Sequence, residues 1–215
     1  MNTPAVITKS AGRPRAADLE ARNENLIFTA GQLFLKHGYG KVSLEMIARE
    51  AHVAVRTIYV KFGGKAGLFK AVLIANRDTF MSPQEMEADP RPFRDVIGEF
   101  SRHFLDMVCA PDAVEVQRMV IAEARTDPEV ATSFYEAGPR QSREVLARYF
   151  SRPDVRSQLR DELAVDLLPS YLLNCVVGDG FARFLFNAGD QANEALARRL
   201  PERLELFFAS VLKKV

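Results

Sequence analysis

The pattern of hydrophobic and polar positions along this chain is helical throughout. In residues 18–36, apolar side chains recur every three or four positions, at Leu26, Ile27, Ala30, Leu33 and Phe34, which is the period of a helix with one buried face. The run 37–40, His-Gly-Tyr-Gly, then ends this helix. Neither strand-like alternation nor an internal repeat occurs in the sequence, so the pattern predicts an all-α protein.

Residues 43–62 predict two short helices joined by a tight turn. Ser43 is a plausible N-cap of the first helix, the turn covers residues 51–54, and the second helix runs over residues 55–61. The apolar positions Met46, Ile47, Ala51, Ile58 and Phe62 face inward. A helix of seven residues with one apolar and one polar or cationic face needs a partner helix behind it and an anion in front of it. This arrangement is typical of a helix-turn-helix, in which the second helix enters the DNA major groove.

Further along, Gly63 and Gly64 end the second short helix, and Lys65 opens a fourth. We expect residues 82–92, which contain three prolines, to be a linker. Beyond it, breakers separate helices expected at 93–109, 112–125, 128–136, 140–151, 162–187 and 191–213. Pro169 lies inside the longest of these, so that helix either kinks there or starts later. The domain prediction is a disordered basic arm at 1–17, a DNA-binding head at 18–80 and a second domain at 90–215, with about nine to ten helices in all.

The charge is distributed unevenly. The net charge of the 215 residues is only +1, but residues 1–80 hold 12 Lys and Arg against 6 Asp and Glu. The N-terminal part therefore carries +6 and the remaining 135 residues carry −5. A basic N-terminal third on an acidic body indicates one surface that binds an anion and another that does not.

Other classes of protein are disfavoured by the composition. Only two cysteines occur, 66 residues apart, which favours a location in the reducing cytosol. Neither a membrane span nor a signal-peptide core is apparent in the sequence. We therefore expect a cytoplasmic protein. The three histidines are isolated, which argues against a metal site. Neither a nucleophile–base–orienter set nor a Gly-rich phosphate loop is present, so we expect no catalytic site, no cofactor and no enzyme.

Residues 19–75 resemble the DNA-binding domain of TetR (tetracycline-repressor-type) regulators. The matching positions are Ile27, Ala30, Leu33-Phe34, Gly38-Tyr39, Ile47-Ala48, Ala51-His52-Val53, Thr57-Ile58-Tyr59, Phe62, Lys65 and Leu68. Four positions depart from the usual pattern: His52 replaces a turn Gly, Ala54 a Ser/Thr cap, Arg56 a frequent Gly or Pro, and Gly64 a Ser/Asn cap. These changes weaken helix capping and leave the apolar pattern intact. The segment 118–139 also resembles the effector domain of one TetR subgroup.

The resemblance implies roles for the recognition helix. Val55, Arg56 and Tyr59 would face the base edges, where an Arg can pair with guanine and a Val can contact a thymine methyl. The polar groups of Thr57, Tyr59 and Lys61 suit phosphate oxygens. Ser43 and Lys65, at helix N-termini, are also expected to bind phosphates. Arg13 and Arg15 on the arm are expected to contact phosphates or to enter an adjacent minor groove. A half-buried Tyr59, solvated lysines and a merely basic terminus are the alternatives.

A single helix-turn-helix covers one half-site, so a homodimer is expected. Small and apolar residues of the last two predicted helices are the candidates for its interface: Gly178, Phe181, Ala182, Phe184, Leu185, Leu204, Phe207, Phe208 and Val211. A ligand pocket is implied by the family, with Phe100, Phe104, Met107, Met119, Phe134, Tyr135 and Phe150 as candidates. Core packing is the alternative explanation for both sets.

The sequence thus predicts a dimeric, ligand-responsive repressor that a small-molecule effector releases from a palindromic operator. We keep two alternatives from other classes. One is an architectural DNA binder without a ligand, and the other is a helical ligand-binding protein with a vestigial DNA-binding head. The residues name neither the effector nor the operator.

Overall fold

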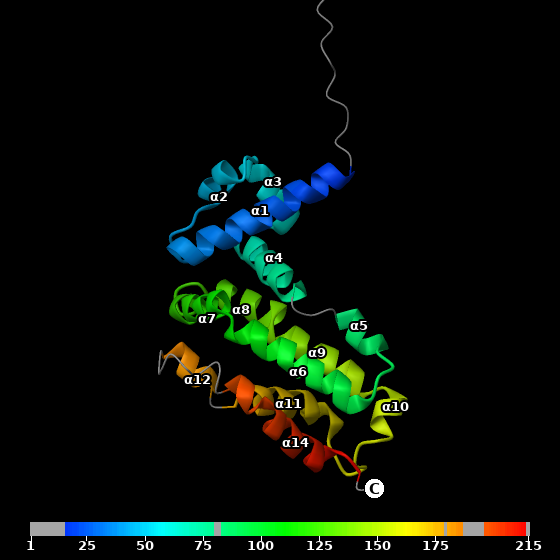
Figure 1. Ribbon diagram of the computed structural model, residues 1–215. Coiled ribbons are helices and arrows are strands. Elements are labelled where there is room, and N and C mark those ends of the chain that lie inside the picture. The colour runs from blue at the N-terminus through cyan, green and yellow to red at the C-terminus, as the bar shows by residue number, and fades with distance from the viewer. Residues whose placement is uncertain (1–15, 80–82, 179, 187–195, 214–215) are drawn as a thin grey trace, which may run out of the picture.

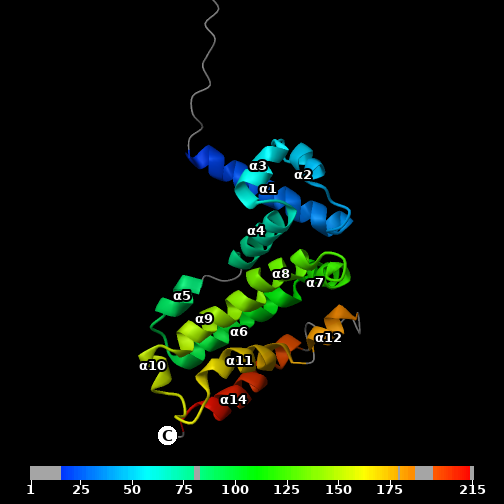
Figure 2. The same cartoon turned by 180° about the vertical axis from the view of Figure 1, so that it is seen from behind.

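A computed structural model describes residues 16–79, 83–178, 180–186 and 196–213. The described residues are helical and contain no strand, which confirms the all-α prediction. The first four helices form a head that sits at one end of a larger helical body, and α4 leads from one to the other (Figure 1). The view from behind shows the same division (Figure 2).

The head contains α1 (Ala16–His37), α2 (Leu44–Glu50), α3 (Val55–Phe62) and α4 (Lys65–Asp78). These bounds confirm the predicted helix-turn-helix. Ser43 caps α2, because its Oγ accepts a hydrogen bond from Met46 N at 3.2 Å. Neither Ala54 before α3 nor Gly64 before α4 provides a side-chain cap. The positions of α3 and α4 therefore depend on tertiary packing more than on capping.

The turn between α2 and α3 contains backbone strain at His52. Its φ is +55°, in the left-handed region, and it is the one non-glycine residue with positive φ in the described part of the chain. A Cβ atom destabilises this conformation, whereas glycine adopts it freely.

Replacing His52 by Gly should therefore raise the free energy of unfolding of the head by about 0.5–1 kcal/mol, the relief of strain being partly offset by the entropy of the unfolded glycine. Thermal denaturation followed by circular dichroism measures this change. His37→Gly is the control, because it ends α1 without positive φ and should lower stability. A His52→Gly variant with a lower melting temperature would contradict the expectation.

The body contains more helices than predicted. Their bounds are α5 (Pro83–Ala88), α6 (Phe93–Cys109), α7 (Pro111–Glu123), α8 (Pro128–Ala137), α9 (Pro139–Phe150), α10 (Pro153–Arg156), the 3₁₀ helix η1 (Val165–Leu167), α11 (Leu168–Val177), α12 (Gly180–Leu185) and α14 (Leu200–Val211). The expected linker at 82–92 is wrong in part, because α5 lies within it. Pro83 is the first residue of α5, a position that requires no N–H donor, and Met86 is buried.

The two predicted C-terminal helices are also shorter than expected. The first, predicted at 162–187, is divided into η1, α11 and α12, since Pro169 lies in the first turn of α11 and Gly178 ends it with φ +55°. This decides the alternative left open at Pro169, because the helix starts later. In the second, Pro201 lies in the first turn of α14. The segment 187–195 lies outside the described residues.

Hydrophobic residues gather in two clusters. The body's own cluster joins α6, α9, α11 and α14, with Ile97, Leu146 and Leu172 fully buried. The head's cluster joins α1 to α4, but it also includes Val120 of α7 and Val130 of α8. The division expected near residues 80–90 therefore does not separate the two cores, because α7 and α8 contribute to the core of the head.

Candidate DNA-binding surface and helical body

The recognition helix α3 is supported from behind by the aromatic core of the head. Ile58 is fully buried, and the adjoining core contains Phe34, Tyr39 and Phe69, whose ring centroids are each 5.4 Å apart. Such packing fixes a helix of eight residues that would be unstable alone. The surface opposite Ile58 is therefore held in a fixed position at the top of the head (Figure 1).

The outward surface of α3 carries Arg56, Tyr59 and Val60. Arg56 is exposed, and the exposed fractions of Tyr59 and Val60 are 57% and 74%. Tyr59 is therefore not a core residue. Val60 was missed by the sequence reasoning, although it lies one turn after Arg56 and hence on the same face. A cation, a hydroxyl and an aliphatic group can together contact a guanine edge, a phosphate and a thymine methyl.

The other predicted residues of this helix lie on its flanks. Val55 and Thr57 are partly buried, and Val55 packs against the head core. Lys61 is exposed, and its Nζ donates a hydrogen bond to Asn23 Oδ1 of α1 at 2.9 Å. The structure thus brings four of the five residues to the surface or flank, and it turns Val55 toward the core.

The two N-terminal positions have other contacts. The Ser43 oxygen caps α2 and is only partly exposed. The Lys65 ammonium lies 4.1 Å from the centroid of the Tyr39 ring. Burial lowers the pKa of Lys65, and the nearby carboxylates of Asp127 and Glu123 oppose this change. Arg13 and Arg15 lie outside the described residues.

The seven residues predicted for a ligand pocket are divided between the two hydrophobic clusters and the surface. Phe100, Phe104 and Phe150 are buried in the body's cluster, and Met107 packs against it. Met119 and Phe134 pack against the core of the head, while Tyr135 is exposed and accepts a hydrogen bond from Arg143.

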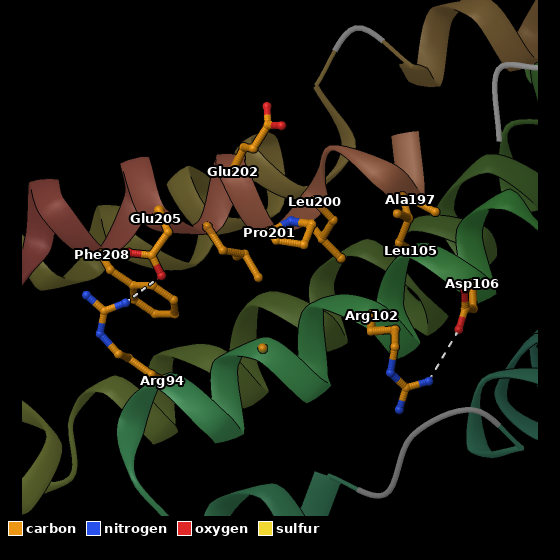
Figure 3. A pocket seen from close by; sticks show the side chains of 12 residues that line it. Arg94, Arg102, Leu105, Asp106, Ala197, Leu200, Pro201, Glu202, Glu205 and Phe208 are labelled. Carbon is orange, nitrogen blue, oxygen red and sulfur yellow. Dashed lines mark hydrogen bonds and ion pairs between the residues drawn. The ribbon is translucent and has the colours of Figure 1, made fainter. Parts of the chain in front are cut away.

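A groove of about 760 Å³ lies elsewhere, between α6 and α14 (Figure 3). Leu105, Leu200, Leu204 and Phe208 give it an apolar floor. Arg94 lies over the Phe208 ring at 4.5 Å and pairs with Glu205 at 2.6 Å. Arg102 Nη1 lies 3.7 Å from Asp106 Oδ2. The helical periodicity of the sequence cannot predict this groove, because the groove depends on the spacing of two helices that lie about 100 residues apart in the chain.

The part of the predicted dimer interface that lies on α14 is wrong. Leu204, Phe207, Phe208 and Val211 are buried within one chain, where they hold α14 against the body. They cannot provide area to a partner. The side chains of Phe181 and Phe184 are outside the described part, Leu185 is partly buried, and Gly178 and Ala182 are exposed.

Exposed apolar residues mark a different surface on the same helices. Leu167, Tyr171 and Phe186, with exposed fractions of 62%, 42% and 80%, lie along the line of η1, α11 and α12. On α14, Leu206 is 72% exposed. The Tyr171 hydroxyl lies 3.2 Å from Ser210 Oγ and joins the two helical segments. We call the surface of Leu167, Tyr171, Gly178, Ala182, Phe186 and Leu206 the apolar face.

The described residues contain no group of three or more His, Cys, Asp or Glu side chains that could hold a metal ion. Among the helices of the described ranges, none is long and apolar enough to cross a membrane.

A short recognition helix on a three-helix support, followed by a separate helical body, defines a helix-turn-helix regulator. Residues 26–72 match the model of the bacterial regulatory proteins of the TetR family. Residues 95–210 match the C-terminal domain of AefR-like transcriptional repressors. Since the second match alone covers more than half of the chain, the protein belongs to the TetR family.

Individual relatives agree with this assignment. The HTH-type transcriptional repressor ComR of Escherichia coli is 35% identical over 81 residues, which are 38% of this chain and 37% of ComR. The uncharacterized regulator YdeS of Bacillus subtilis is 26% identical and covers 88% of this chain and 89% of its own. A TetR-family regulator from Mesorhizobium loti has the same fold, with a TM-score of 0.73, 20% identity and coverage of 94% and 100%.

Proposed function

We propose that this protein is a dimeric transcriptional repressor that binds palindromic operator DNA through α3 and is released by a small molecule bound in its body. The outward surface of α3, with Arg56, Tyr59 and Val60 exposed on a buried support, carries the proposal. The balance of +6 in residues 1–80 supports it, since DNA is a polyanion.

The apolar face is the proposed dimer interface. One α3 reads one half-site, so two copies related by a twofold axis would read a palindrome. Phe186 and Leu206 are both large and mostly exposed in the single chain. Ala182, which is exposed on α12, has a small side chain that would let the backbone of a partner helix approach closely.

The groove between α6 and α14 is the proposed effector site. Its volume suits a small organic molecule. Gly98 lines it in the middle of α6, and a Cβ atom there would meet nothing within 4 Å. A glycine inside a helix costs about 0.5–1 kcal/mol relative to alanine, so open space above Gly98 fits a role in admitting a ligand.

Replacing Gly98 by Phe, whose Cβ would meet nothing within 4 Å, should fill the groove and make operator binding insensitive to effector. The effector used would be a compound that a thermal-shift screen shows to stabilise the wild type. Fluorescence anisotropy of labelled operator measures its release. Gly98→Ala is the matched control and should be released normally. A Gly98→Phe variant that is released like the wild type would contradict the assignment of the groove.

Salt dependence provides a direct test of DNA binding. The affinity for a random-sequence duplex, which reflects phosphate contacts, should fall steeply as the salt concentration rises. Replacing Lys61 by Ala should reduce the slope of log K against log salt by about 1. An affinity that does not change with salt concentration would contradict the proposal of DNA binding. If the thermal-shift screen found no stabilising compound, the alternative of an architectural DNA binder without a ligand would be favoured.

A further inference from the structure

The segment that follows α1 is held by side chains of α7. Tyr39 N donates a hydrogen bond to Met119 Sδ at 3.1 Å, and Gly40 N donates one to Glu123 Oε1 at 3.1 Å. Two successive backbone N–H groups of the head are therefore bound by one helix of the body. The Thr126 hydroxyl lies 3.3 Å from the second oxygen, Glu123 Oε2, and helps to fix the carboxylate.

The absence of a side chain at position 40 permits this close approach. A Cβ atom there would lie 2.6 Å from Glu123 Oε1, so a larger residue would displace the carboxylate from its hydrogen bond. Gly40 is not among the residues with positive φ, so its backbone conformation does not by itself require a glycine.

The same helix also contacts α12, one of the proposed dimer helices. Arg118 of α7 donates from Nε to the carbonyl oxygen of Leu185, the last residue of α12, at 3.1 Å. Arg118 and Glu123 lie five residues apart, so α7 connects the proposed dimer helices directly with the head. In Figures 1 and 2, α7 lies between α12 and the end of α1.

On the side of the head, this contact lies beneath the DNA-binding elements. Tyr39 stacks on Phe34, which belongs to the core behind α3 and α4. The ammonium group of Lys65 lies over the Tyr39 ring. Burial, together with the carboxylates of Asp127, Glu129 and Glu123, raises the pKa of Tyr39 to about 12. The residue that α7 holds is therefore part of the core that positions α3.

We propose that Glu123 is a positioning residue that fixes the orientation of the DNA-binding head relative to the dimer helices through its hydrogen bond to Gly40. This inference rests on the proposed function. While this contact holds, a displacement of α7 carries the Tyr39–Gly40 segment with it, and the spacing of the two α3 helices then follows α7.

Hydrogen exchange of the full-length protein tests the contact without DNA. In Glu123→Ala the amide of Gly40 should exchange at least about tenfold faster, because a hydrogen bond to a charged group is lost. Glu123→Gln retains an acceptor and should stay close to the wild type. Glu115→Ala, on the same helix but paired with Arg118, is the control and should leave Gly40 unchanged. Unchanged exchange in a folded Glu123→Ala protein would overturn the proposal.

Operator spacing tests the consequence. We would compare the affinities for the preferred operator and for one with an additional base pair between its half-sites. Glu123→Ala should reduce the ratio of these affinities at least about threefold, because looser heads tolerate the longer spacing. Gly40→Ala should reproduce this result and Glu123→Gln should not.

A merely structural role would weaken both complexes by the same factor, and an unchanged ratio in Glu123→Ala and Gly40→Ala would overturn the proposal. A wild type without operator preference would instead contradict the proposed function. The hydrogen exchange of Gly40 still decides whether Glu123 holds the head.

Discussion

Replacing Leu206 by Glu should convert the protein to a monomer and abolish tight binding to a palindromic operator. Leu206 lies on α14 with 72% of its surface exposed. It lies one turn before Ser210, whose Oγ is 3.2 Å from the hydroxyl of Tyr171 on the apolar face. In a twofold interface the substitution occurs twice, and each unpaired buried charge costs about 3–5 kcal/mol. The combined penalty approaches the stability of a micromolar dimer, about 8 kcal/mol.

Sedimentation velocity at micromolar concentration measures this effect, and anisotropy with labelled operator gives its consequence. Ile121→Glu is the matched control, because Ile121 is also an exposed aliphatic residue, at 60%, and lies on α7 outside the apolar face. That variant should remain dimeric. A Leu206→Glu protein that sediments as a dimer would show that another surface forms the interface.

Replacing Arg56 by Ala should weaken operator binding by roughly 5- to 150-fold, which corresponds to about 1–3 kcal/mol for a bidentate contact with guanine. The preference for one base pair in each half-site should relax at the same time. Arg56 lies in the first turn of α3, on the outward surface, where recognition helices contact base edges.

A panel of operators with single base-pair changes, measured at one salt concentration, gives both quantities. Arg148→Ala on α9 removes the same charge outside the head and outside the groove, and it should leave the affinity unchanged. If Arg56→Ala weakened all operators of the panel by the same factor, Arg56 would be a phosphate contact rather than a base contact.

Local signals made the head predictable. The period of apolar residues lies within each helix, and the breakers Gly38, Gly63 and Gly64 lie directly beside a helix end, so α3 ends within one residue of its predicted end. The same signals located α6 at 93–109. The prolines did not by themselves show where helices begin. Pro83 starts α5 inside the segment expected to be a linker. Pro169 lies in the first turn of α11, where a kink was the alternative.

Contacts between distant segments could not be predicted in this way. Glu123 and Gly40 are 83 residues apart, and nothing in the local pattern pairs them. On α14, hydrophobicity alone did not separate Leu204, which is buried, from Leu206, which is exposed. Val60 was overlooked for the same reason, since an aliphatic residue on a short helix is expected to face the core.

Selection of operators from a pool of random duplexes by the full-length protein tests the central claim most directly. We expect a palindromic sequence whose half-sites are separated by about one or two helical turns, about 10 base pairs each. The wild type should enrich this sequence, and the Arg56→Ala variant should lose a specific base pair of each half-site. A pool that yields no enriched sequence, or only a single unpaired half-site, would contradict the account.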